Sequence, residues 1–63
     1  MSASVPDWIP HRLMTVEEVA ELLHVSVRQI RRLIADDQLE AISIRRSVRI
    51  RPEAVAALLN QDD

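Results

Sequence analysis

The sequence predicts a small, mostly α-helical domain that carries one short β-hairpin. Three observations support this fold class. Two segments begin with a helix-capping signature and continue with apolar residues at helical spacing. A third segment alternates apolar and polar residues with a period of two, which is typical of paired strands. Pro52 then suits the first position of a closing helix, whose apolar face contains Val55, Leu58 and Leu59.

The first two helices are predicted from their capping signatures. The segment Thr15-Val16-Glu17-Glu18 has the Thr-x-x-Glu spacing of a capping box, and the apolar residues after it predict a helix over residues 16–23. The segment Ser26-Val27-Arg28-Gln29 repeats this logic as Ser-x-x-Gln and predicts a second helix that ends near Asp36. Only His24 and Val25 separate the two helices. Two short helices joined by such a tight turn indicate a helix-turn-helix.

The hairpin is predicted from the alternation of apolar residues over residues 42–50. A register that keeps apolar side chains on one face pairs Ile44 with Val48, and Ile42 with Ile50. This register leaves residues Arg45, Arg46 and Ser47 as a three-residue loop. A two-residue loop would pair Arg45 with Val48 and mix the faces, so the three-residue loop is the prediction.

Composition limits the chemistry that the domain can perform. A chain of 63 residues, with one Trp and no Phe or Tyr, can build one thin aliphatic core. The lack of cysteine excludes disulfides and thiolate zinc sites. Two histidines, without a phosphate-binding glycine loop or metal-ligand spacing, argue against an enzyme, a metal site or a cofactor. No apolar run approaches the roughly 20 residues that cross a bilayer, and no signal peptide is recognised, so a cytoplasmic protein without a membrane partner is expected by exclusion.

The chain ends are expected to be less ordered than the domain. Residues 1–12 contain two prolines and little periodicity, which predicts an extended or loose tail. The domain is predicted over residues 13–60, and a short C-terminal tail over residues 61–63. Trp8 and Ile9 have two interpretations: they fold back to cover the thin core, which is favoured, or they contact a partner protein.

All eight basic residues are arginines, and their positions indicate a nucleic-acid interface. Seven of them lie between Arg28 and Arg51, where only three acidic residues occur, although the net charge of the chain is −2. Genome composition alone could favour arginine over lysine, so the positions of the arginines, and not their identity, indicate the interface. On the second helix, steps of about 100° place Arg28 and Arg32 opposite the apolar centre near Ile30, with Gln29 and Arg31 on the flanks. Arginine and glutamine can read guanine and adenine edges.

The order of these elements, helix, tight turn, helix, arginine-tipped hairpin and closing helix, is that of a small winged helix-turn-helix. Residues 13–26 resemble the opening of the excisionase-type DNA-binding domain, which is related to the MerR superfamily. Residues 28–34 resemble its recognition helix, and residues 44–50, followed by Pro52-Glu53-Ala54-Val55, are similar to its wing and closing helix. The resemblance covers residues 13–59, about three quarters of the chain. It implies a DNA-binding domain of this fold.

The chain contains no glycine, and it therefore departs from the family that it resembles at three positions where that family usually has glycine. Members of that family usually carry glycine in the turn between the helices, after the second helix and in the wing. His24, Asp37 and Arg45 occupy these positions here. Histidine and aspartate are among the residues that tolerate left-handed backbone geometry. Arg45 is explained less easily, and either a phosphate contact or a different wing conformation is expected.

The resemblance implies an excisionase, or recombination directionality factor, which binds repeated sites cooperatively, bends double-stranded DNA and assists an integrase. A transcriptional regulator of the same fold is the first alternative, and a protein-interaction module of the adaptor or antitoxin type is the second. We expect Arg28, Gln29 and Arg32 to contact base edges in the major groove, and Ser26 and Arg31 to contact phosphate. The expected wing contacts are made by Arg45, Arg46, Ser47, Arg49 and Arg51, with Arg51 left open between a phosphate contact and an outward strand residue.

Overall fold

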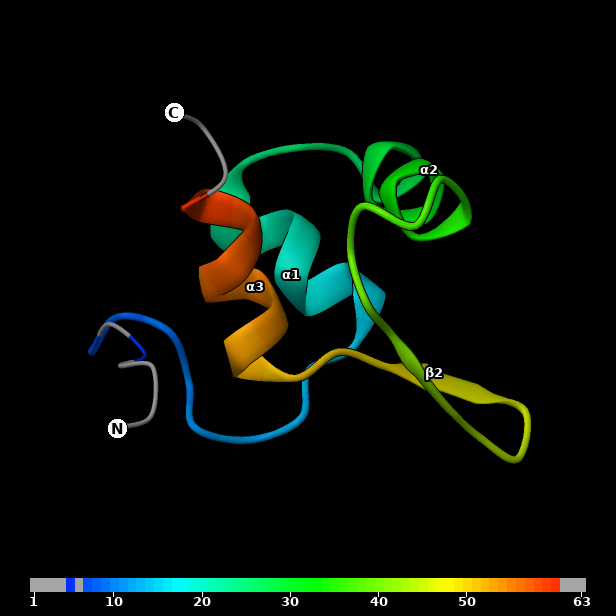
Figure 1. The fold of residues 1–63 in the computed structure, drawn as a ribbon, viewed down its shortest axis with the longest axis horizontal. Helices are drawn as coiled ribbons and strands as arrows, with labels where there is room; N and C mark the ends of the chain where they lie inside the picture. The colour runs from blue at the N-terminus through cyan, green and yellow to red at the C-terminus, as the bar shows by residue number, and fades with distance from the viewer. Residues whose placement is uncertain (1–4, 6, 61–63) are drawn as a thin grey trace.

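The chain folds as a winged helix-turn-helix made of three helices and a two-stranded antiparallel hairpin. A computed structural model describes residue 5 and residues 7–60. In chain order the elements are α1 (Val16–Leu23), α2 (Val27–Ala35), β1 (Ile42–Ile44), β2 (Ser47–Arg49) and α3 (Pro52–Leu59). In Figure 1, α1 lies between the other two helices and the hairpin extends away from all three. The predicted fold class is confirmed, and all three helices begin where their sequence signals predict.

Both helices of the helix-turn-helix begin with a complete capping box. At α1 the Glu18 backbone N–H donates to the Thr15 hydroxyl oxygen (3.0 Å), and the Thr15 backbone N–H donates to the Glu18 carboxylate (2.9 Å). At α2 the Gln29 backbone N–H donates to Ser26 Oγ (3.1 Å), and the Ser26 backbone N–H donates to Gln29 Oε1 (3.2 Å). Each box satisfies backbone N–H groups that have no acceptor within the helix. Both capping predictions are therefore confirmed.

Among the residues that the structure describes, three have a positive φ angle, and they stand at the positions where the family that the chain resembles carries glycine: His24 (60°), Asp37 (62°) and Arg45 (58°). His24 is the C-cap of α1, and Asp37 follows the C-cap of α2. A left-handed residue after a helix is a common way to turn the chain out of it. The expected geometry at His24 and Asp37 is confirmed. Arg45 has the same geometry, so the wing keeps the backbone of a glycine turn although a Cβ atom is present.

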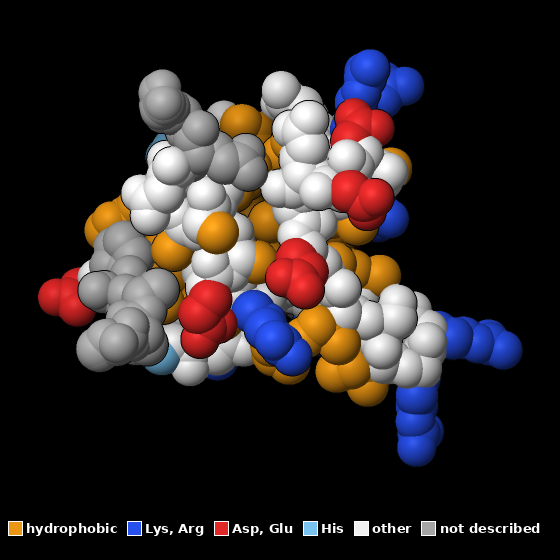
Figure 2. Space-filling view, viewed as in Figure 1, with side chains coloured by type: hydrophobic (Ala, Val, Ile, Leu, Met, Phe, Trp, Pro, Cys, Tyr) orange, Lys and Arg blue, Asp and Glu red, His pale blue; other side chains and the backbone are white. Residues whose placement is uncertain are grey.

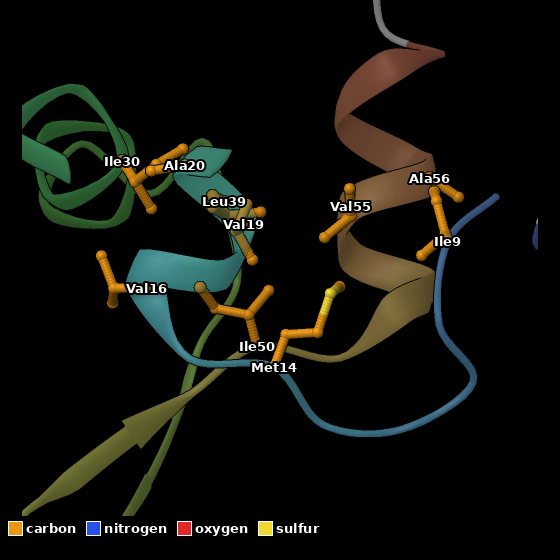
Figure 3. Packing of buried hydrophobic residues seen from close by; sticks show 10 residues of the cluster. All are labelled: Ile9, Met14, Val16, Val19, Ala20, Ile30, Leu39, Ile50, Val55 and Ala56. Atoms are coloured by element: carbon orange, nitrogen blue, oxygen red, sulfur yellow. The ribbon is translucent and has the colours of Figure 1, made fainter. Parts of the chain in front are cut away.

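The core is aliphatic and receives residues from nearly every segment of the domain. Figure 3 shows its buried side chains converging between the three helices, with Leu39 from the segment before β1 and Ile50 from the segment after β2. Complete burial of an Ile or Val side chain stabilises the folded state by about 1.5–3 kcal/mol, so each of these side chains matters in so small a domain. The buried apolar residues of the described chain are Ile9, Met14, Val16, Val19, Ala20, Ile30, Leu39, Ile50, Val55 and Ala56.

The hairpin register differs from the prediction. Ile42 pairs with Arg49, Ser43 with Val48 and Ile44 with Ser47, which leaves Arg45 and Arg46 as a two-residue loop. The prediction was wrong because it assumed that one face of the hairpin is buried. Ile44 and Val48 are instead 47% and 36% exposed, so burial does not select the register.

Ile50, which the prediction placed in the hairpin, belongs to the core instead. Its backbone forms an antiparallel bridge with Met14, with N–H to O distances of 2.8 and 2.9 Å in the two directions. Both side chains are buried. This bridge joins the segment before α1 to the segment before α3, and it fixes the base of the wing against the helices.

The N-terminal segment divides between the core and the surface. Ile9 is fully buried, as the favoured interpretation of this segment predicted, whereas Trp8 is 54% exposed. In Figure 1 the segment passes below α3, which places Ile9 against that helix in Figure 3. Of the predicted tails, residues 1–4, 6 and 61–63 lie outside the described residues. Within the described ranges, no helix has the length and apolar character needed to cross a membrane.

Candidate nucleic-acid interface

The solvent-facing side of α2 is basic. Ile30 is fully buried and fixes which side of the helix meets the core. Arg28, Arg31 and Arg32 are exposed, and Arg28 and Arg32 lie on the same side because they are four residues apart. Asp36 is the C-cap, so no acidic residue occurs within the helix itself. Within residues 7–60, no ion pair involves any of these arginines. Their guanidinium groups are therefore available to an external anion or base edge.

The first turn of α2 combines this basic surface with an open helix N-terminus. The capping box gives the Gln29 N–H an acceptor, and the Ile30 N–H donates to the Ser26 carbonyl oxygen (3.2 Å). The N–H groups of Val27 and Arg28 occupy the first two helical positions, where no intrahelical acceptor exists. A helix N-terminus carries a partial positive charge that favours anions. The predicted phosphate-contacting residues Ser26 and Arg31 lie on this turn and on the next.

The capping box uses two side chains that were also predicted to contact DNA. Ser26 Oγ accepts the Gln29 N–H, and Gln29 Oε1 accepts the Ser26 N–H. The Ser-x-x-Gln pattern that predicted the helix start already implied this use of the Gln29 carboxamide. The Gln29 side chain was thus predicted to make two contacts, and in the structure it lies in the cap. The carboxamide nitrogen remains without a hydrogen-bond partner in the described chain.

The wing presents a pair of arginines at its outer end. Arg45 and Arg46 form the two central positions of the turn between β1 and β2, and both are exposed. A positive φ at the first central position alone is typical of a type II′ turn. Figure 2 shows basic side chains extending into solvent from the end of the hairpin. Two adjacent like charges at a turn repel each other in the free protein, so this arrangement favours a bound anion.

The remaining predicted wing residues lie nearer the base of the hairpin. Ser47 begins β2 and is exposed. Arg49 ends β2, is partly buried, and donates from Nη1 to the Val48 carbonyl oxygen (3.0 Å). Arg51 lies outside the strand, as the N-cap residue of α3, and lines a groove with the acidic residues Glu40 and Glu53. Arg51 is thus separated from the arginine pair at the turn and shares its groove with acidic residues.

An ion pair that the sequence did not reveal joins the N-terminal segment to α1. Arg12 Nη1 and Nη2 contact the two carboxylate oxygens of Glu18 at 3.1 and 2.9 Å. The contact with Arg12 is the largest cause, and the hydrogen bond from the Thr15 backbone N–H the second largest, of a lowering of the Glu18 pKa to about 2. The spacing of six residues across a non-helical segment gives no periodic signal. The ion pair with Glu18 engages Arg12, which is the one arginine of the sequence outside the basic cluster of residues 28–51.

A helix-turn-helix domain family matches residues 13–63 of the chain. The chain belongs to this family. Helix-turn-helix domains place their second helix in the DNA major groove, and membership of the family indicates DNA binding. The match includes the wing and α3 as well as the two helices of the motif. No match was found among curated proteins, and none among solved structures.

Proposed function

We propose that this protein is an excisionase, or recombination directionality factor, that binds double-stranded DNA through α2 and the wing. The observation that supports it most is the combination of an unpaired arginine face on α2 with an arginine pair on the wing turn. A helix in the major groove and a hairpin on the adjacent backbone or minor groove are two separate contacts that fix orientation on the duplex. The resemblance of residues 13–59 to the excisionase-type domain, stated above, adds the recombination role.

Each proposed DNA contact follows from the position of its side chain. Arg28 and Arg32 contact base edges in the major groove, because they lie together on the outward side of α2. Arg31 contacts phosphate, together with Ser26 and the N-terminus of α2. Arg45 and Arg46 contact the backbone or the minor groove, where groove width is read. Ser47 and Arg49 support that contact at the edge of the wing, and Arg51 contributes least, because it shares its groove with Glu40 and Glu53.

A salt titration tests DNA binding directly. If four arginines meet phosphates, log K for duplex DNA falls with log salt concentration at a slope of about −3.6. Fluorescence anisotropy of a labelled duplex at several salt concentrations measures this slope. Binding that is absent, or that does not change with salt, contradicts DNA binding and leaves the protein-interaction module as the better interpretation.

Cooperative binding follows from the size of the domain. Its principal dimensions are 32 × 25 × 20 Å, and a single small module buries only about 600–1,000 Å² of protein surface on DNA. One copy therefore carries limited specificity, and neighbouring copies on repeated sites would supply the rest. We propose that such an array bends the DNA beside an attachment site and assists an integrase there, in the cytoplasm.

A functional assay separates the proposed role from its first alternative. The protein is added to a purified integrase of the source element and a supercoiled substrate that carries the attachment sites. Stimulation of excision, with a footprint of repeated protected sites beside the attachment core, supports the excisionase role. Protection of a promoter without an effect on excision identifies a transcriptional regulator of the same fold.

A further inference from the structure

The carboxamide of Gln29 is held at the start of the recognition helix by a hydrogen bond from the Ser26 backbone N–H, within a reciprocal capping box. The Ser26 N–H donates to Gln29 Oε1 at 3.2 Å, and the Gln29 N–H donates to Ser26 Oγ at 3.1 Å. The Ser26 hydroxyl also lies 3.5 Å from Oε1, at the long limit for a hydrogen bond. Reaching back to the cap keeps the carboxamide over the first turn of α2.

This arrangement removes the contact that glutamine usually makes with DNA. Glutamine reads adenine with both ends of its carboxamide, because the oxygen accepts from N6 and the nitrogen donates to N7. In this protein Oε1 already accepts the Ser26 N–H. Gln29 can pair with adenine in this way only by leaving the cap, which deprives the Ser26 backbone N–H of its acceptor at the helix start. Loss of a helix cap lowers the folding equilibrium constant about fivefold, and this cost disfavours a contact between Gln29 and adenine.

We propose that Gln29 is a positioning residue, which fixes the first turn of the recognition helix while Arg28 and Arg32 carry the base readout. The inference rests on the proposed DNA-binding function and makes it more specific. Both arginines are exposed on the outward side of α2 and have no partner in the described chain. Arginine pairs with the O6 and N7 acceptors of guanine, so the major-groove preference of the protein is for guanine rather than adenine.

Four variants separate positioning from base readout. Ser26→Ala and Gln29→Ala each remove one half of the same cap, and the double variant removes both. Each is measured by chemical unfolding and by binding to a set of duplexes in which every base pair of the site is changed singly. Gln29→Glu is the conservative variant, because glutamate at this position keeps a cap acceptor but cannot donate to a base.

A positioning role gives coupled and uniform effects. Each alanine variant lowers the folding equilibrium constant about fivefold, and the double variant costs less than the two single variants together, because the two side chains are in contact and each hydrogen bond of the box holds the other in place. The alanine variants weaken binding to every duplex by the same factor, so the order of preferred base pairs is unchanged. Gln29→Glu restores the unfolding free energy and keeps that order, although its negative charge weakens all sites together.

Base readout by Gln29 gives a different pattern and would overturn the proposal. In that case Gln29→Ala removes the preference at a single base pair, and Ser26→Ala leaves that preference intact. Additive unfolding effects of the two alanine variants also contradict it, because they show that the side chains do not act as one cap. If the wild-type protein binds no duplex, the proposed DNA-binding function fails instead, and the unfolding cycle still tests the cap.

Discussion

Replacing Arg45 by glycine should stabilise the protein and weaken its binding to DNA. Arg45 has a φ of 58°, where a Cβ atom costs about 1–2 kcal/mol relative to glycine. Glycine loses more backbone entropy on folding, which offsets about 0.4–1 kcal/mol of that gain. The expected net stabilisation is about 0.5–1 kcal/mol, or a rise in Tm of about 2–8 °C for a domain of this size.

The same substitution removes one of the proposed phosphate contacts. The slope of log K against log salt concentration should then become less steep by about 0.9. Differential scanning calorimetry measures the change in Tm, and the anisotropy titration measures the slope. The two changes have opposite consequences for the protein, because the folded state gains stability while the complex with DNA loses affinity.

Two matched variants isolate the backbone effect from the charge effect. Arg45→Ala removes the guanidinium but keeps a Cβ atom, so it should reduce the salt slope equally without raising Tm. Asp37→Gly relieves a φ of 62° on an exposed residue outside the proposed contacts, so it should raise Tm and leave the slope unchanged. A fall in Tm for Arg45→Gly refutes the strain argument. An unchanged slope in both Arg45 variants refutes the phosphate contact.

Five further substitutions test the interface, the core and the ion pair. Arg32→Ala should cost about 1–3 kcal/mol of binding and relax discrimination at one base pair, whereas Arg46→Ala should weaken all duplexes equally in the same binding assay. Ile9→Ala should lower the unfolding free energy by about 2–5 kcal/mol in a urea titration, because Ile9 is fully buried, whereas Trp8→Ala should have little effect on it. The pKa of Glu18 falls from about 4.5 to about 2 on folding, so its carboxylate stabilises the folded state above pH 4.5. This stabilisation is lost as the pH falls from about 4.5 to about 2. Glu18→Gln should therefore make the unfolding free energy less dependent on pH in that range, as measured by acid unfolding.

The helices were predictable from the sequence because their start signals are local. Each capping box involves residues three apart, so its pattern can be read without knowledge of the tertiary structure. The left-handed geometry of His24 and Asp37 was also expected, since the family that the chain resembles places glycine there, whereas the backbone of Arg45 was left open. The exposed arginine face of α2 follows from helical periodicity alone, once Ile30 is assigned to the core.

The parts that could not be predicted depend on contacts between distant segments. The predicted hairpin register was wrong because a pattern of apolar residues fixes the register only where one face of the hairpin is buried, and this wing projects into solvent. Ile50 continues the alternating pattern of the hairpin, yet it is drawn into the core by its bridge to Met14. The Arg12–Glu18 pair spans a segment without regular structure, where no spacing rule applies.

The net charge of −2 is compatible with DNA binding because the opposite charges occupy different parts of the chain. Three acidic residues occur within the basic stretch, Asp36, Asp37 and Glu40, and all three follow α2 and precede the wing. The other acidic residues lie on or around α1 and α3 or near the chain ends. At physiological salt the Debye length is about 8 Å, which is well below the 20–32 Å dimensions of the domain. Remote acidic residues are then screened from the DNA, whereas the arginines of α2 and the wing turn act at contact distance. The net charge therefore opposes long-range attraction, and affinity must come from short-range contacts and from neighbouring copies.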